Sequence, residues 1–187
     1  MRKDFKSKSA IYPMPVLIIG SYDKNGKPDA MNAAWGGIYD YDKVFVSLGS
    51  HTSTDNIRLS KAFTISFATK KTVEISDYVG LVSMKNEPNK IEKAGLHPFK
   101  SEHVNAPMFE EYPLTIECEV DEMDGELGEG AYLVGKIINV SADESILTDD
   151  KIDIKKLEPI AFDGFNNKYL LVNEEVADAF KVGLKLK

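Results

Sequence analysis

The sequence predicts a mainly β fold, a Greek-key β-barrel with a few added helices. Short segments alternate apolar with polar residues at the period of a strand. An Asn-Gly pair marks a tight hairpin turn. The segments follow one another without regular intervening helices, which favours antiparallel pairing over a βαβ fold. A Rossmann domain is disfavoured because the chain contains no G-x-G-x-x-G motif.

The first third of the chain is expected to form a hairpin, two further strands and a helix. The strands are expected at residues 15–22, 28–35, 44–48 and 63–67. The first is rich in β-branched and aromatic residues, and the last two alternate apolar with polar residues. Asn25-Gly26 predicts the turn of a hairpin, because both residues tolerate positive φ. Hydroxyl residues followed by Asp55 predict a helix over 52–59.

The remaining segments begin with a helical region. Apolar residues fall near helical spacing over 72–94, and Gly80 and Pro88 interrupt them, which predicts two short inserted helices. Later strands are expected at 114–120 and 131–140, short extended pieces at 160–162 and 169–172, and a closing helix at 174–182. At roughly 100–200 residues per domain, the whole chain 1–187 is expected to form a single domain with a helical insertion at about 72–95.

Composition excludes several classes of protein. The chain has 187 residues, a formal net charge of −7 and no basic cluster with interleaved aromatic residues, so nucleic-acid binding is not expected. Apolar runs stay far short of the ~20 residues that span a bilayer. The basic start lacks the apolar stretch of a signal peptide, so a cytoplasmic location with no membrane association is expected.

Side-chain chemistry is poorly represented. The one cysteine, Cys118, cannot form an intramolecular disulfide, and its alternating strand predicts a packed residue. His51, His97 and His103 do not pair at metal-ligand spacing, so no metal site is expected. No G-x-S-x-G segment positions a serine nucleophile. The sequence therefore assigns no catalytic side chain.

A turn rich in glycine and hydroxyl residues is the first candidate site. Residues 49–56 read GSHTSTDN, follow a predicted strand and open a predicted helix. The unpaired N–H groups of a helix N-terminus, together with hydroxyl donors, suit a phosphate. Simple N-capping by Thr52 or Ser53 is the alternative interpretation.

A second candidate site lies at the end of the preceding strand. Residues 31–37 read MNAAWGG and include the single tryptophan. Small side chains allow a flat ring to lie against the backbone; alternatively, they permit close strand packing with Trp35 in the core. Lys85 and Lys90 in the helical insertion either reach an anion or are solvated.

An ordered series of segments resembles the flavoredoxin branch of the flavin reductase-like family. The segments are PVLIIGSYDKNGKPDAMNAAWGG, VFVSLG, AFTISF, DYVGLVS, NKIEKAGL, YPLTIECEV and the closing LEPIAFDGFNNKYLLVNEEVADAFKVG. The resemblance runs from about Ala10 to Gly183. It implies a Greek-key FMN-binding split barrel that forms a homodimer, with flavin near the subunit interface.

The resemblance also implies which residues would hold the flavin. The residues lining the isoalloxazine ring would be Asn32, Ala33, Ala34 and Trp35. Those following the ribityl chain would be Ser47, Leu48 and Gly49. Those surrounding the phosphate would be Ser50, His51, Thr52, Ser53 and Asn56, with Ser83 and Lys90 contributed by the insertion.

The function expected from this resemblance is that of an FMN-dependent oxidoreductase. It would transfer electrons between NAD(P)H, or a redox protein partner, and flavin or another acceptor. Flavin accepts a hydride or single electrons at its own ring, so the protein needs no dedicated nucleophile. A non-catalytic flavin-binding or storage protein on the same barrel is the alternative, since a barrel alone does not establish catalysis. An enzyme of the pyridoxamine-phosphate oxidase type is a third interpretation.

Overall fold

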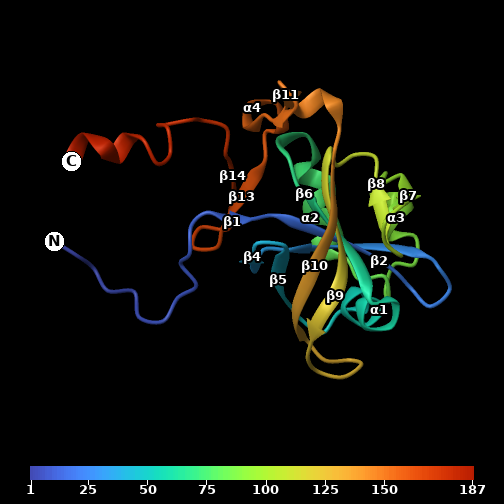
Figure 1. Cartoon of the computed structure of the whole chain (residues 1–187). Coiled ribbons are helices and arrows are strands. Elements are labelled where there is room, and N and C mark those ends of the chain that lie inside the picture. Colours follow the sequence, from blue (N-terminus) through green and yellow to red (C-terminus); the bar gives the residue numbers. More distant parts are fainter.

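The computed structural model describes residues 1–187, and a curled antiparallel sheet forms its body (Figure 1). Seven strands lie in the order β3-β2-β6-β9-β10-β5-β4. Their bounds are Leu17–Tyr22 (β2), Pro28–Ala33 (β3), Gly36–Asp40 (β4), Lys43–Leu48 (β5), Ala62–Phe67 (β6), Leu114–Met123 (β9) and Ala131–Ala142 (β10). The mainly β class with a barrel-like sheet is confirmed.

The predicted hairpin is present. Strands β2 and β3 pair from Leu17 opposite Ala33 to Tyr22 opposite Pro28. Gly26 has φ +77°, a conformation that glycine adopts at little steric cost. The Asp23 carboxylate accepts hydrogen bonds from the N–H groups of Asn25 and Lys27, each at 2.8 Å. The predicted return strand to residue 35 ends earlier, at Ala33.

Apolar side chains are buried on both faces of the sheet. Leu17 and Ile19 of β2 point into the curl and pack with Phe63, while Ile18 points to the outer face. This outward cluster is covered by helix α2 (Val73–Leu81), helix α3 (Lys90–Lys93) and strand β8 (Pro107–Phe109). Alternation along β2 therefore supplies both cores, because successive side chains of a strand face opposite ways.

All three helices expected before residue 95 are present. Helix α1 (Thr52–Ser60) follows β5 and stops at Lys61, which adopts the left-handed conformation. The insertion contains α2 and α3, preceded by the 3₁₀ turn η1 (Lys70–Thr72). No helix of the protein is long and apolar enough to cross a membrane.

Several short elements of two to five residues were not predicted, because so few residues carry too little pattern. Strand β4 is one of them. The others are β1 (Met14–Pro15), β7 (Pro98–Lys100), β8, β11 (Leu147–Thr148), β12 (Lys151–Ile152), η2 (Glu144–Ile146) and α4 (Ile154–Leu157). The extended pieces expected near 160 and 170 are β13 (Ile160–Asp163) and β14 (Lys168–Leu171), which join β1 in a three-stranded sheet.

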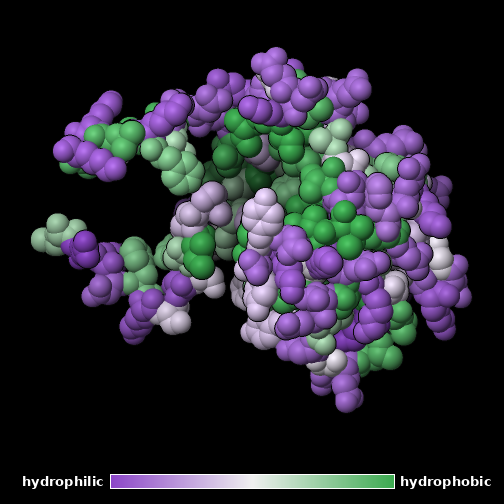
Figure 2. Space-filling view, in the orientation of Figure 1, coloured by the Kyte–Doolittle hydropathy of each residue, from purple (hydrophilic) through white to green (hydrophobic).

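The closing helix predicted over 174–182 is wrong. The chain beyond β14 has no helix until the 3₁₀ turn η3 (Val182–Leu186). Val176 and Phe180 are 94% and 100% exposed, so the segment has no surface of its own chain to pack against. A short helix without such packing is marginal in water. Both chain ends project from the body (Figure 1), and Figure 2 shows hydrophobic side chains lining a hollow beside them.

Candidate functional site

A cavity of about 240 Å³ lies where the edge strand β3 meets the start of α1 and the end of α2. It brings together six residues predicted from the sequence: Asn32, His51, Thr52, Ser53, Ser83 and Lys90. Asp29, Met31 and Met84 line it as well, together with residues 79–82 of α2 and its C-cap. The hydroxyl turn and the helical insertion, separate in sequence, therefore form opposite walls of one cavity.

The N-terminus of α1 faces this cavity without a capping side chain. His51 is the N-cap residue, with extended backbone, and its side chain makes no capping hydrogen bond. Thr52 is already the first helical residue, and the Ser53 hydroxyl donates to Asp29 Oδ2 at 2.6 Å. The capping interpretation of Thr52 and Ser53 is thus wrong. The first N–H groups of the helix therefore remain available to an acceptor. The start of a helix favours an acceptor that is anionic.

Lys90 places a positive charge in the wall of the cavity. Its side chain is 3% exposed, and its Nζ lies 3.3 Å from Asp29 Oδ1, whose side chain is 1% exposed. Burial lowers the pKa of Lys90, and the Asp29 carboxylate opposes that shift. An ammonium has three donors, and the carboxylate of Asp29 is its protein acceptor here. The remaining N–H groups suit an anionic ligand.

Asp29 was not predicted as a site residue from the sequence. It sits in β3 between Pro28 and Ala30, and Asn32 is the one other polar residue of that strand. The sequence contained one indication of this role, a carboxylate within a predicted strand. Buried charges are expected to be paired. The partner of Asp29 is Lys90, and no local sequence pattern predicts a contact between positions so far apart.

Close packing of α2 on β3 closes one side of the cavity. The Asn32 amide donates to the carbonyl oxygen of Ser76 at 2.9 Å. One turn later Gly80 lies so near that an added Cβ would be 2.8 Å from the Cβ of Asn32. Gly80 therefore interrupts the apolar pattern because a larger side chain would collide with Asn32.

Ala34 and Trp35 lie elsewhere, in a groove of about 510 Å³. The groove runs between β4 and the N-terminal arm, and Phe45 contributes to its wall. Trp35 is 58% exposed, so the interpretation of Trp35 as a core residue is wrong. Ala33, between the two cavities, is buried inside the curl.

The remaining predicted residues do not line the smaller cavity. Leu48 belongs to the core, and Asn56 is buried, with its amide 3.4 Å from Ser21 Oγ. The Ser50 hydroxyl donates to the carbonyl oxygen of Gly128 at 2.5 Å and holds the β9–β10 turn. Ser47 bonds through its N–H to the carbonyl oxygen of Trp35, which links β5 to the groove. Gly49 is exposed, and an added Cβ would lie 2.8 Å from His51 Nε2.

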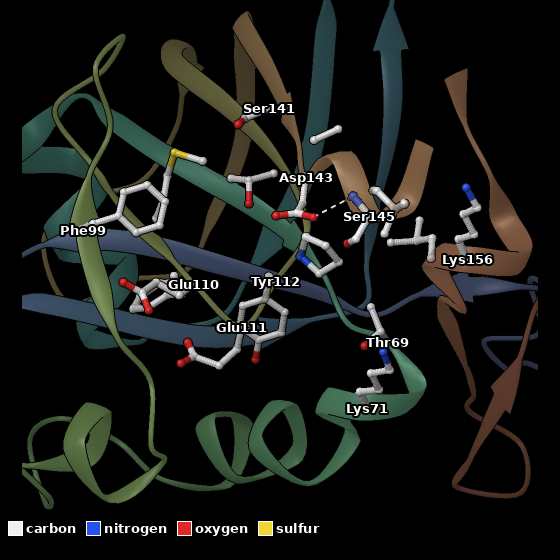
Figure 3. Close-up of a pocket in the computed structure, with 17 residues that line it drawn as sticks. Thr69, Lys71, Phe99, Glu110, Glu111, Tyr112, Ser141, Asp143, Ser145 and Lys156 are labelled. Atoms are coloured by element: carbon white, nitrogen blue, oxygen red, sulfur yellow. Dashed lines mark hydrogen bonds between the residues drawn. The ribbon is translucent and has the colours of Figure 1, made fainter. Parts of the chain in front are cut away.

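A larger cavity of about 540 Å³ opens at the other end of the sheet (Figure 3). It contains none of the predicted residues. Its polar side chains are mostly engaged: Asp143 accepts from the N–H of Ser145 at 2.8 Å, Glu111 accepts from His97, and Lys156 donates to the carbonyl oxygen of Leu147. Size alone therefore does not identify the functional cavity.

Cys118 is fully buried, as the sequence predicted, and burial raises its pKa to about 12. Its thiol is therefore not a nucleophile at neutral pH. His, Cys, Asp and Glu side chains nowhere gather in a group of three or more that could hold a metal ion.

Known proteins share both the sequence pattern and the architecture. Residues 9–158 match the family model described as Flavin reductase like domain. The flavoredoxin of Desulfovibrio vulgaris (Miyazaki F) is 35% identical and superimposes with a TM-score of 0.91, over 98% of this chain and 100% of that one. A flavoredoxin from Methanosarcina acetivorans is 29% identical, with a TM-score of 0.88 and full coverage of both chains. An uncharacterized protein of Halalkalibacterium halodurans is 22% identical over 81% of this chain and 78% of its own length.

Proposed function

This chain belongs to the flavin reductase like domain family, and we propose on that basis that it is an FMN-dependent oxidoreductase. It would pass electrons from NAD(P)H, or from a redox protein partner, to flavin or another acceptor. The observation that carries the proposal is the buried ammonium of Lys90 beside the uncapped start of α1. These two features suit the phosphate that distinguishes FMN from riboflavin.

The donor set fits FMN in chemical terms. Thr52 and the first N–H groups of α1 would hold the phosphate, with Lys90 on the facing wall. Ala34 and the exposed Trp35 line the groove on the other side of Ala33, and we assign the flat ring to that groove. When bound, the flavin would supply the redox chemistry at its own ring. The protein would bind the cofactor, orient it and shield one face of the ring with Trp35.

An absorption spectrum tests this function directly. Protein purified with FMN should show the visible absorption band of bound oxidised flavin, and anaerobic NADH or NADPH should bleach it. If neither nucleotide bleaches the band, two interpretations remain: an electron carrier reduced by another protein, or a non-catalytic flavin-storage protein. Failure to bind FMN in a fluorescence titration would contradict the flavin function itself.

We also propose that the chain forms a homodimer. The projecting tail exposes Val176, Phe180 and Leu186, and the N-terminal arm exposes Phe5 and Ile11. Exposed apolar patches of this kind mark interaction sites, and a second copy would cover the same surface on both subunits. Sedimentation equilibrium should give twice the mass of one chain; the mass of a single chain would contradict the proposal. A cytoplasmic location stays a prediction from the sequence.

A further inference from the structure

The cavity at the start of α1 has an unusual charge balance for a phosphate site. Apart from His51, the titratable side chains that line it are Lys90 and Asp29, and these carry opposite charges. Both are almost completely buried, so water screens their fields weakly. A negatively charged ligand that meets the ammonium therefore also meets the carboxylate.

Asp29 is fixed in this position from two sides. Lys90 Nζ lies 3.3 Å from Oδ1, and the Ser53 hydroxyl donates to Oδ2 at 2.6 Å. The first contact joins β3 to α3, and the second joins β3 to α1. The carboxylate cannot turn away from an incoming anion without breaking one of these bonds, both of which are buried.

The same arrangement occupies donors that a phosphate would otherwise use. The Ser53 hydroxyl proton points to Asp29, so Ser53 offers its backbone N–H rather than its side chain. One N–H of Lys90 is directed to the carboxylate as well. Thr52 retains a hydroxyl without a protein partner in the cavity wall.

We propose that Asp29 is the specificity-determining residue of this cavity, and that its carboxylate limits the preference for phosphorylated over unphosphorylated flavin. The inference rests on the proposed flavin function. Because the carboxylate offsets part of the charge of Lys90, the phosphate of FMN gains less attraction than the ammonium alone would supply. A repulsive group of this kind lowers selectivity between two ligands that share the rest of their structure.

Titration of flavin fluorescence with FMN and with riboflavin tests the inference. The wild type should prefer FMN by about tenfold or less. Asp29→Asn keeps the size of the side chain and removes its charge, so FMN should bind about tenfold more tightly. Riboflavin affinity should change by less than about twofold, because riboflavin carries no phosphate. Inorganic phosphate should displace FMN from the variant at correspondingly lower concentration.

Glu74→Gln is the matched control, since it removes a carboxylate from the exposed side of α2 and lies outside the cavity. Both flavins should bind this control as they bind the wild type. Asp29→Ser supplies a second neutral variant if Asp29→Asn does not fold. The role of Asp29 would be overturned by an unchanged ratio of FMN to riboflavin affinity in the neutral variant, or by weaker FMN binding with riboflavin binding intact. Neither result would overturn the proposed flavin function. A wild type that binds neither flavin overturns the proposed function as well.

Discussion

The hydroxyl of Tyr12 donates a hydrogen bond to Asp163 Oδ1 at 2.5 Å and thereby joins the N-terminal arm to strand β13, 151 residues later. Asn166 donates to the same carboxylate through its side chain and its N–H, and the N–H of Phe165 donates as well. These bonds stabilise the ionised carboxylate. The side chains of Asn166 and Tyr12 have the largest effects, and the pKa of Asp163 falls to about 2.

This depressed pKa predicts a pH-dependent contribution of Tyr12 to stability. Because the folded pKa lies below the ordinary value of 3.8, the stabilisation is present above about pH 4 and is lost as the pH falls towards 2. Tyr12→Phe should therefore lower the urea midpoint at pH 7 more than at pH 3. Tyr41→Phe, at a fully exposed position, is the control and should change neither midpoint. An equal loss at both pH values would contradict the assignment.

Buried Glu117 predicts a large effect on stability. It accepts hydrogen bonds from the hydroxyl of Ser101 and from the Asn139 amide, the latter at 2.6 Å. Glu117→Ala should lower the free energy of unfolding by about 2 kcal/mol, because the buried Ser101 hydroxyl and the half-buried Asn139 amide lose their acceptor. Glu119→Ala, two residues along the same strand and exposed, should cost much less in chemical denaturation. Equal losses in the two variants would show that the network is unimportant.

Contact between Gly80 and Asn32 predicts that a methyl group at position 80 disturbs the cavity. Gly80→Ala should force α2 away from β3, cost about 1–3 kcal/mol of stability and weaken FMN binding. Gly183→Ala is a suitable control, because an added Cβ there meets nothing within 4 Å. Calorimetry and flavin titration measure the two effects. If folded Gly80→Ala protein binds FMN as the wild type does, the wall formed by α2 is not part of the FMN site.

The free hydroxyl of Thr52 predicts a selective loss of FMN affinity. Thr52→Ala should weaken FMN about fivefold, the effect of one lost hydrogen bond of about 1 kcal/mol, and leave riboflavin affinity unchanged. Ser60→Ala removes a hydroxyl at the opposite end of α1, where it bonds to the Ala62 carbonyl oxygen, and should not affect flavin binding. Parallel loss of both flavins in Thr52→Ala would indicate a damaged helix instead of a lost phosphate contact.

The thiol of Cys118 is expected to be inert in the folded protein. Its pKa of about 12, raised first by burial and further by the charge of Glu117, leaves almost no thiolate at pH 8. A thiol reagent such as dithiobis(nitrobenzoate) should react only after denaturant unfolds the chain. Complete reaction within minutes in native buffer would contradict the burial of this strand.

The local sequence pattern was sufficient to predict most of the longer helices and strands. The hairpin around Asn25-Gly26, the alternating strands and the helix after residue 51 appear where the sequence predicts them, because turn geometry and strand period are properties of neighbouring residues. The missed strands are β1, β4, β7, β8, β11 and β12, which are strands because of their pairing partners and not because of their own residues. The closing helix failed for the converse reason: its pattern had no surface to pack against.

The candidate site was predictable in part. The sequence by itself determined the mainly β class, the hydroxyl turn at the start of α1 and the family to which the chain belongs. Only the tertiary structure decided that Lys90 is buried against Asp29, and that Trp35 faces a different groove from the cavity at α1. The physical reason is that burial and charge pairing depend on which distant segments meet. Residues 29 and 90 acquire their role from a contact across 61 positions of the chain, and no local period encodes such a contact.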